Sequence, residues 1–311
     1  MIPIALDELS KILQELHHMK SRYGDVDEKL RGWYWYQPPV EPPLKSVKLS
    51  VSEISNRYCP TMRDVYLRHV EGIKVKPTRA MIEGRIYHDI IKELSLIAKR
   101  ELYYRGPIPG HELLSLLMER SDKCIEGIIG RYLNGGNTED VFIKARNLWR
   151  FLSLQLSSRV DMVLSKYSER IHIDTLVLSS MPPAVERIVD GSRVGLSSRL
   201  MVDSLELSNI LVDFKTGRKE WFHRICLAGY ALAMESDSML PVDYGLLVYI
   251  RLNESGTTPR IYVRPYLIND EIRREFIELR DKAFAIVHTE RDPGIAHSCS
   301  PSCPYYSICR G

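Results

Sequence analysis

The sequence lacks any long apolar run. No window approaches the roughly 20 consecutive apolar residues that a membrane-spanning helix requires, and the first 24 residues mix charged side chains and histidines into an apolar pattern that is unlike a signal peptide. Net charge is also small, at +3, so the overall charge does not predict binding to a polyanion. We therefore expect a cytoplasmic protein with no membrane partner, in which any contact with nucleic acid depends on local clusters of positive charge.

Cysteine is scarce as well, with six residues in 311, yet three of the six close the chain as Cys299, Cys303 and Cys309. In a cytosolic protein, thiols this crowded are typical of metal ligands and not of disulfides. The best candidate for a fourth ligand is Cys59, which precedes a proline in a turn. The spacing Cys-x3-Cys-x5-Cys lacks the paired Cys-x-x-Cys usual for zinc, which favours an iron-sulfur cluster. Zinc, or four unrelated reduced cysteines, are the alternatives.

Periodicity divides the rest of the chain. A helix is expected at 6–23, followed by a Trp- and Pro-rich arm whose aromatics pack over the protein's own surface or stack on a base or a partner. Residues 52–178 read as mostly helical, and after Pro183 the period changes to two. Strands are expected at 184–189, 193–203, 210–215, 244–251 and 260–267, and helices at 78–104, 110–133, 138–167, 220–235 and 270–289. The predicted regions are 1–50 (helix and arm), 51–180 (helical, with Cys59), 181–290 (sheet core) and 291–311 (cysteine loop).

Two of these strands form a hairpin that carries the chemistry. Alternation places Asp213 and Lys215 on one face, and a turn near Ser208 would bring Asp203 opposite Asp213. Two carboxylates and one lysine suit a hard divalent cation such as Mg²⁺ or Mn²⁺, because oxygen ligands hold these ions and a lysine can orient water or offset phosphate charge. An Asp-x-Lys triplet also arises by chance on surface hairpins, so the triplet alone does not identify the site.

With its neighbours, the hairpin resembles the RecB-like branch of the PD-(D/E)xK nucleases. Gly84-Arg-Ile-Tyr-His88 is similar to the helical histidine motif of that branch, Asp213-Phe-Lys215 matches its Asp-x-Lys motif, and Tyr230 falls where its last motif has a tyrosine. One cysteine before the histidine motif and three at the end resemble the exonucleases of CRISPR spacer acquisition, the fourth Cas family. The N-terminal arm resembles the archaeal Csa-type branch of that family.

This resemblance implies an α/β fold with a restriction-endonuclease-like mixed central sheet flanked by helices, a helical subdomain and a C-terminal iron-sulfur loop. It implies a metal-dependent exonuclease that trims single-stranded DNA ends for CRISPR spacer acquisition, alongside CRISPR integrase subunits and a paralogous nuclease. It also implies a [4Fe-4S] cluster in preference to [2Fe-2S]. The implied roles are metal ligation by His88, Asp203 and Asp213 with the carbonyl of Phe214, catalysis by Lys215 with these aspartates and Glu186, and DNA contact by Tyr230 and Arg218.

Two departures from the family pattern support another interpretation. Met201 stands where the family has the aspartate of Gly-x-x-Asp, and a thioether is a poor ligand for a hard cation. Asp203, two residues later, faces the same side of the strand as Met201 and is expected to replace the missing aspartate. Cys226 stands where a glutamine is expected. The alternative function is a catalytically impaired, nuclease-like DNA-binding subunit of the CRISPR integration complex, and a third is a DNA-repair nuclease. Structural roles also stay open: core packing for His88, Tyr230 and Cys226, and a solvent-facing position for Glu186 and Arg218.

Overall fold

A computed structural model of the chain describes residues 6–133, 138–167, 171–181, 184–206, 209–252, 258–299 and 303–311. The helices and strands follow in chain order. They are α1 (Leu6–Tyr23), the 3-10 turns η1 (Glu28–Leu30) and η2 (Gly32–Tyr34), α2 (Val51–Ser55), α3 (Arg63–His69), α4 (Arg79–Arg105), α5 (Gly110–Glu119), α6 (Ser121–Tyr132), α7 (Glu139–Tyr167), α8 (Ile173–Ser180), β1 (Ala184–Val189), η4 (Ser192–Val194), β2 (Leu200–Glu206), β3 (Ile210–Lys215), α9 (His223–Ser238), β4 (Tyr244–Arg251), β5 (Arg260–Leu267), α10 (Asp270–Thr289) and α11 (Tyr306–Arg310).

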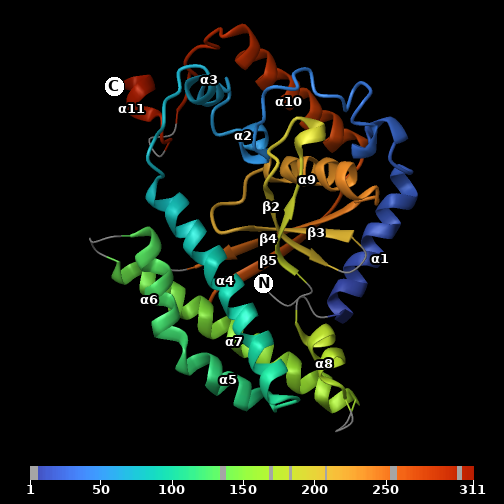
Figure 1. Ribbon diagram of the computed structural model, residues 1–311, viewed down its shortest axis with the longest axis vertical. Coiled ribbons are helices and arrows are strands. Elements are labelled where there is room, and N and C mark those ends of the chain that lie inside the picture. The colour runs from blue at the N-terminus through green and yellow to red at the C-terminus, as the bar shows by residue number, and fades with distance from the viewer. Residues whose placement is uncertain are drawn as a thin grey trace.

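A five-stranded mixed sheet lies at the centre, with helices on both sides (Figure 1). The strand order is β1-β2-β3-β4-β5; β3 and β4 are parallel and the other neighbours antiparallel. Helix α9 connects the two parallel strands, which cannot be joined by a tight turn. This confirms the predicted α/β class with a mixed sheet flanked by helices. Within the described residues, no helix is both long and apolar enough to cross a membrane.

Most predicted elements have the expected bounds, and β2 is the main correction. The strand predicted at 193–203 runs instead from Leu200 to Glu206, and a 3-10 turn occupies Ser192–Val194. Gly195 ends that turn with φ of +80°, a left-handed conformation that interrupts an extended strand. The helix predicted at 110–133 is two helices, α5 and α6, and α9 begins at His223 instead of at 220.

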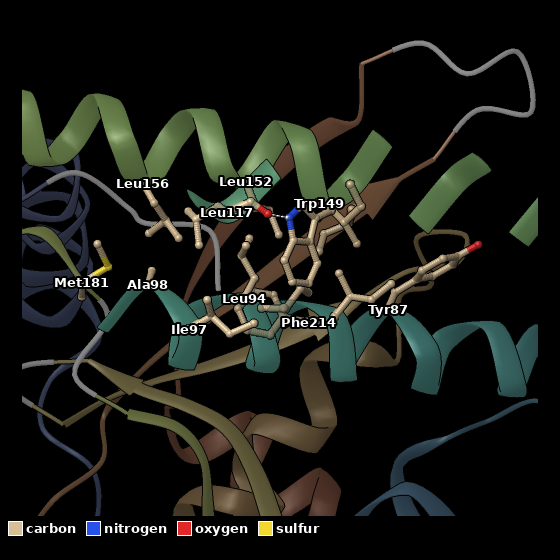
Figure 2. Packing of buried hydrophobic residues seen from close by; sticks show 14 of the residues in the cluster. Tyr87, Leu94, Ile97, Ala98, Leu117, Trp149, Leu152, Leu156, Met181 and Phe214 are labelled. Atoms are coloured by element: carbon tan, nitrogen blue, oxygen red, sulfur yellow. Dashed lines mark hydrogen bonds between the residues drawn. The ribbon is translucent and has the colours of Figure 1, made fainter. Parts of the chain in front are cut away.

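Two hydrophobic cores lie on opposite faces of the sheet, as alternation along β3 requires. Val212 and Phe214 pack with α4 and α7, whereas Leu211 packs with α9 and α10. Figure 2 shows the first core, where the fully buried Trp149 of α7 donates its indole N–H to the carbonyl of Leu117, 2.9 Å away. The indole therefore buries its large apolar surface without leaving its donor unsatisfied.

Buried arginines of α10 fix the N-terminal arm. Arg280 donates to the carbonyl oxygens of Pro39, Val40 and Glu41 at 3.0, 2.6 and 3.2 Å. Trp35 packs against the second core. These contacts confirm the prediction that the arm packs over the protein's own surface.

Candidate active site

The candidate site lies where the β2–β3 hairpin opens. The two strands pair from Glu206↔Ile210 to Ser204↔Val212. At the next position, Oδ2 of Asp203 accepts a hydrogen bond from the backbone N–H of Phe214 at 2.7 Å. The Asp203 carboxylate thus accepts from a backbone N–H group of β3 that directly follows Asp213 in the chain. The predicted approach of Asp203 to Asp213 is therefore present in the structure.

Helix α4 brings His88 to this carboxylate. Its Nδ1 lies 3.2 Å from Oδ1 of Asp203, and its ring stands edge-on to Phe214 with centroids 6.2 Å apart. Burial alone would lower the pKa of His88, but the charge and hydrogen bond of Asp203 raise it above its ordinary value. One turn earlier, Gly84 faces Thr216, because a Cβ there would lie 3.3 Å from the threonine Oγ1. The small residue thus lets α4 approach the end of β3.

Asp213 and Lys215 form an ion pair at the end of β3, with Nζ 2.8 Å from Oδ2. The two side chains share a face, as alternation predicts. Burial raises the pKa of Asp213, and the Asp203 charge adds to that rise against the opposing effect of Lys215. Burial would lower the pKa of Lys215, but the charge of Asp213 raises it well above its ordinary value. Lys215 is therefore a cation at neutral pH.

Helix α9 borders the site through Cys226 and Tyr230. The Cys226 Sγ lies 3.4 Å from Oδ2 of Asp213 and 2.8 Å from the carbonyl oxygen of His223, and either oxygen can accept a hydrogen bond from the thiol. Burial raises the pKa of this thiol well above its ordinary value, and the Asp213 charge adds to it, so the thiol stays neutral. The half-buried Tyr230 lies close enough for the charges of Asp213 and Lys215 to act on its hydroxyl.

The remaining predicted residues lie farther out. Met201 is 56% exposed on β2 and pairs with Ile188 of β1, so its thioether lies at the surface. Asp203 is the residue of β2 that contacts His88. Arg218 is exposed in the loop after β3. Glu186 belongs to β1, but its side chain lies outside the described part of the structure.

The donor set suits a hard divalent cation. It offers two carboxylates and an imidazole at one end of the sheet, and carboxylate oxygens are the ligands that Mg²⁺ and Mn²⁺ prefer. Among the residues that the structure describes, no three His, Cys, Asp or Glu side chains already stand around a common point as metal ligands. Instead Asp203 contacts His88 and Asp213 contacts Lys215. A cation would therefore have to replace existing ionic contacts.

Sequence reasoning missed the aromatic residues beside this site. His223 stacks on Tyr249 with ring centroids 5.8 Å apart, and its Nδ1 lies 3.3 Å from the tyrosine hydroxyl. Burial and the charge of Lys215 lower the pKa of His223 to about 4. The run Trp221-Phe222-His223, which directly follows a cation-rich loop, was the available signal.

The structure brings the two cysteine-bearing segments together. Figure 1 shows α11 near α3, and Nη1 of Arg63 in α3 lies 3.1 Å from the Cys309 Sγ in α11. Burial raises the pKa of Cys303, and the charges of Cys59 and Cys309 add to that rise, so these three thiols lie near one another. Cys299 lies 3.8 Å from a nearby carbonyl oxygen, that of Ala296. The Arg63 guanidinium favours a thiolate at Cys309, and thiolates are the ligands of iron-sulfur clusters. Among the described residues no three cysteines already stand together as metal ligands, so a cluster would have to draw these thiols closer.

Comparison with known proteins bears on these observations. The model of the family described as CRISPR-associated exonuclease Csa1 matches residues 4–311. The chain belongs to the Csa1 family. A relative from Saccharolobus solfataricus, named CRISPR-associated exonuclease Csa1, is 35% identical over 286 residues, which cover 92% of each chain. Another of the same name, from Thermoproteus tenax, is 31% identical over 306 residues, 97% of this chain and 99% of the relative.

The Csa1 match extends over the arm, the helical region, the sheet and the cysteine loop. This confirms the predicted resemblance to the archaeal Csa-type CRISPR-associated exonucleases.

Proposed function

We propose that this chain is a metal-dependent deoxyribonuclease that degrades DNA from single-stranded ends and thereby prepares it for integration into a CRISPR array. One observation carries the proposal: in a member of an exonuclease family, Asp203, Asp213, His88 and Lys215 meet where β2 and β3 separate. We also assign the sheet and its flanking helices to the restriction-endonuclease-like PD-(D/E)xK fold. DNA is the substrate, and CRISPR integrase subunits, with a paralogous nuclease, are the proposed partners.

His88, Asp203 and Asp213 would hold Mg²⁺ or Mn²⁺ together with the carbonyl of Phe214. When bound, the cation supplies Lewis-acid stabilisation of a phosphodiester and an acidified water. The Phe214 N–H fixes the Asp203 carboxylate, so a cation would find that ligand already oriented. The neutral Cys226 thiol can do the same for Asp213.

Lys215 has a separate role. Its raised pKa keeps it charged, so it acts as a hydrogen-bond donor and positive charge and not as a general base. At this position it would orient the attacking water and offset the negative charge that develops on the phosphate. Tyr230 and Arg218 would contact the strand, and the Glu186 carboxylate would complete the acidic set.

We further propose that Cys59, Cys299, Cys303 and Cys309 hold an iron-sulfur cluster, [4Fe-4S] in preference to [2Fe-2S]. The approach of three of these thiols and the Arg63 guanidinium beside Cys309 support the proposal. Such a cluster would clamp the turn before α3 to the C-terminal loop and contribute to folding.

The test is degradation of end-labelled single-stranded DNA in Mn²⁺ by anaerobically purified, cluster-loaded protein. Lys215→Ala is compared with Lys282→Ala, a control at an exposed position of α10. The expected result is activity in the wild type and the control, abolished by chelation, and a loss of about 10²-fold or more in Lys215→Ala. DNA binding without hydrolysis by folded wild-type protein would overturn the nuclease and favour the DNA-binding subunit that Met201 and Cys226 suggest.

A further inference from the structure

Three aromatic rings from two distant segments meet beside the candidate site. Tyr58, from the turn before α3, stands edge-on to Phe222 with ring centroids 4.9 Å apart, and Trp221 stands edge-on to the same ring at 5.7 Å. Phe222 is 4% exposed, whereas Tyr58 and Trp221 are 57% and 63% exposed. We call these three residues the aromatic platform. It presents two large rings to solvent on a buried aromatic base.

The platform is held firmly on its inner side. Phe222 belongs to the second hydrophobic core and stands edge-on to His223, which in turn stacks on Tyr249 of β4. The turn that carries Tyr58 is fixed by a hydrogen bond from Arg57 Nη2 to the carbonyl of Pro60 at 2.8 Å. Rings held in this way lose little conformational freedom when a ligand stacks on them.

The platform also adjoins the candidate active site. The loop that ends in Trp221 and Phe222 begins directly after Lys215, and the charges of Glu220 and, less strongly, of Lys215 act on the hydroxyl of Tyr58. The same loop carries the exposed cations Arg218 and Lys219. Glu220 is the one acidic residue of that loop, so its net charge is positive. Exposed aromatics beside cations suit a polyanion that also offers flat rings.

We propose that the aromatic platform binds unpaired bases of a DNA strand by stacking, while the cations of the loop contact its phosphates. This inference rests on the proposed function, since it names how that site would take its substrate. A duplex keeps its bases stacked within the helix, so Tyr58 and Trp221 would select single-stranded ends. Sequence-independent stacking is also what an exonuclease requires, because every base has an aromatic face.

The test measures binding of fluorescein-labelled oligothymidylate and of an abasic strand of equal length by full-length protein in EDTA, where hydrolysis is blocked. Stacking is worth about 1–3 kcal/mol per base, so Trp221→Ala should weaken binding of oligothymidylate by roughly 5- to 150-fold. Its affinity for the abasic strand should not change. Trp221→Phe should restore most of the difference, and Tyr58→Ala should behave like Trp221→Ala. Tyr104→Ala, at an 87% exposed position on α4, is the matched control and should leave both affinities unchanged.

Equal affinity of wild type and Trp221→Ala for oligothymidylate, or equal losses for both strands, would overturn the inference. The nuclease assay separates this outcome from failure of the proposed function. A protein that cleaves DNA but shows no loss on Trp221→Ala retains the function and refutes the platform. A protein that does not cleave but discriminates base-bearing from abasic strands through Trp221 supports the platform and refutes the hydrolase.

Discussion

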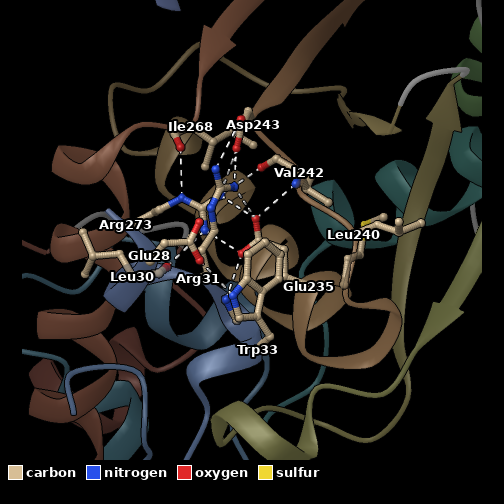
Figure 3. A network of polar contacts seen from close by, with 12 residues as sticks. Glu28, Leu30, Arg31, Trp33, Glu235, Leu240, Val242, Asp243, Ile268 and Arg273 are labelled. Atoms are coloured by element: carbon tan, nitrogen blue, oxygen red, sulfur yellow. Dashed lines mark hydrogen bonds and ion pairs between the residues drawn. The ribbon is translucent and has the colours of Figure 1, made fainter. Parts of the chain in front are cut away.

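Glu235 of α9 should be one of the most sensitive positions in the fold. Its carboxylate is fully buried and accepts hydrogen bonds from Arg31 at 2.9 Å and from Arg273 at 2.8 Å twice, as Figure 3 shows. It also accepts from the backbone N–H groups of Gly32 and Val242 at 2.8 and 3.0 Å. The residue therefore ties the N-terminal arm, α10 and the start of β4 to α9.

The perturbation is Glu235→Gln, which keeps the shape of the side chain. The amide NH₂ would replace Oε1 or Oε2, and each of these oxygens accepts from Arg273 and from a backbone N–H, so a donor would face donors. The change also removes one of the two buried carboxylates that compensate Arg31 and Arg273, and leaves Asp243, which pairs with Arg31 and lies 3.8 Å from Arg273, as the other. Breaking a buried ion pair on one side costs about 3–5 kcal/mol. With a urea m value of about 3 kcal/mol/M, the midpoint should fall by about 1–1.7 M.

The assay is urea unfolding followed by circular dichroism, with Glu271→Gln as the matched control. Glu271 lies in the first turn of α10 with a 74% exposed side chain, 3.9 Å from Arg224, so its loss should cost less than about 0.5 kcal/mol. Limited proteolysis should also cut the arm of Glu235→Gln faster than that of the control. Equal midpoints for the two variants would refute the reasoning that Glu235 is the centre of this network.

Three further predictions concern stability. The pKa of Glu53 is about 2 instead of 4.5, because the hydrogen bonds that its carboxylate accepts outweigh its burial. Up to about 3 kcal/mol of stability should therefore be lost as the pH falls from 4.5 to 2. Unfolding measured at each pH should show a shallower loss in Glu53→Gln. Cys303→Ser should lower the visible absorbance and the melting temperature of anaerobic protein; unchanged spectra would argue against its role as a ligand. Gly195→Ala should destabilise the protein by about 1–3 kcal/mol, because φ is +80° and the ring of Phe284 lies 2.8 Å from the added Cβ. Gly127→Ala in α6 has open space around it and should stabilise the protein by up to about 1 kcal/mol.

Strand and helix bounds followed from the apolar pattern, because burial on both faces gives β3 and β4 short continuous apolar runs and burial on one face gives the helices a period of 3.6. The start of β2 did not, since the turn at Gly195 depends on packing from elsewhere in the chain. The approach of Asp203 to Asp213 could be predicted from the hairpin alone. The contact of His88 with Asp203 could be reached only through a family resemblance, because it joins residues far apart in the sequence.

Other features could not be predicted because they depend on contacts between distant segments. Nothing in the sequence marks Arg273 and Arg280 as buried, yet both are fully buried and hold the arm. The run Trp221-Phe222-His223 marks an aromatic segment in the sequence, but only the shared contact with Phe222 reveals Tyr58 and Trp221 as one surface.

We propose that Asp203 is the carboxylate that replaces the strand aspartate of the family pattern, and that Met201 lies outside the chemistry. The most direct measurement compares Asp203→Asn with Met201→Leu in degradation of end-labelled single-stranded DNA in Mn²⁺. The account predicts a loss of about 10²-fold or more for Asp203→Asn and activity within a few-fold of wild type for Met201→Leu. Activity in Asp203→Asn within a few-fold of wild type would contradict it.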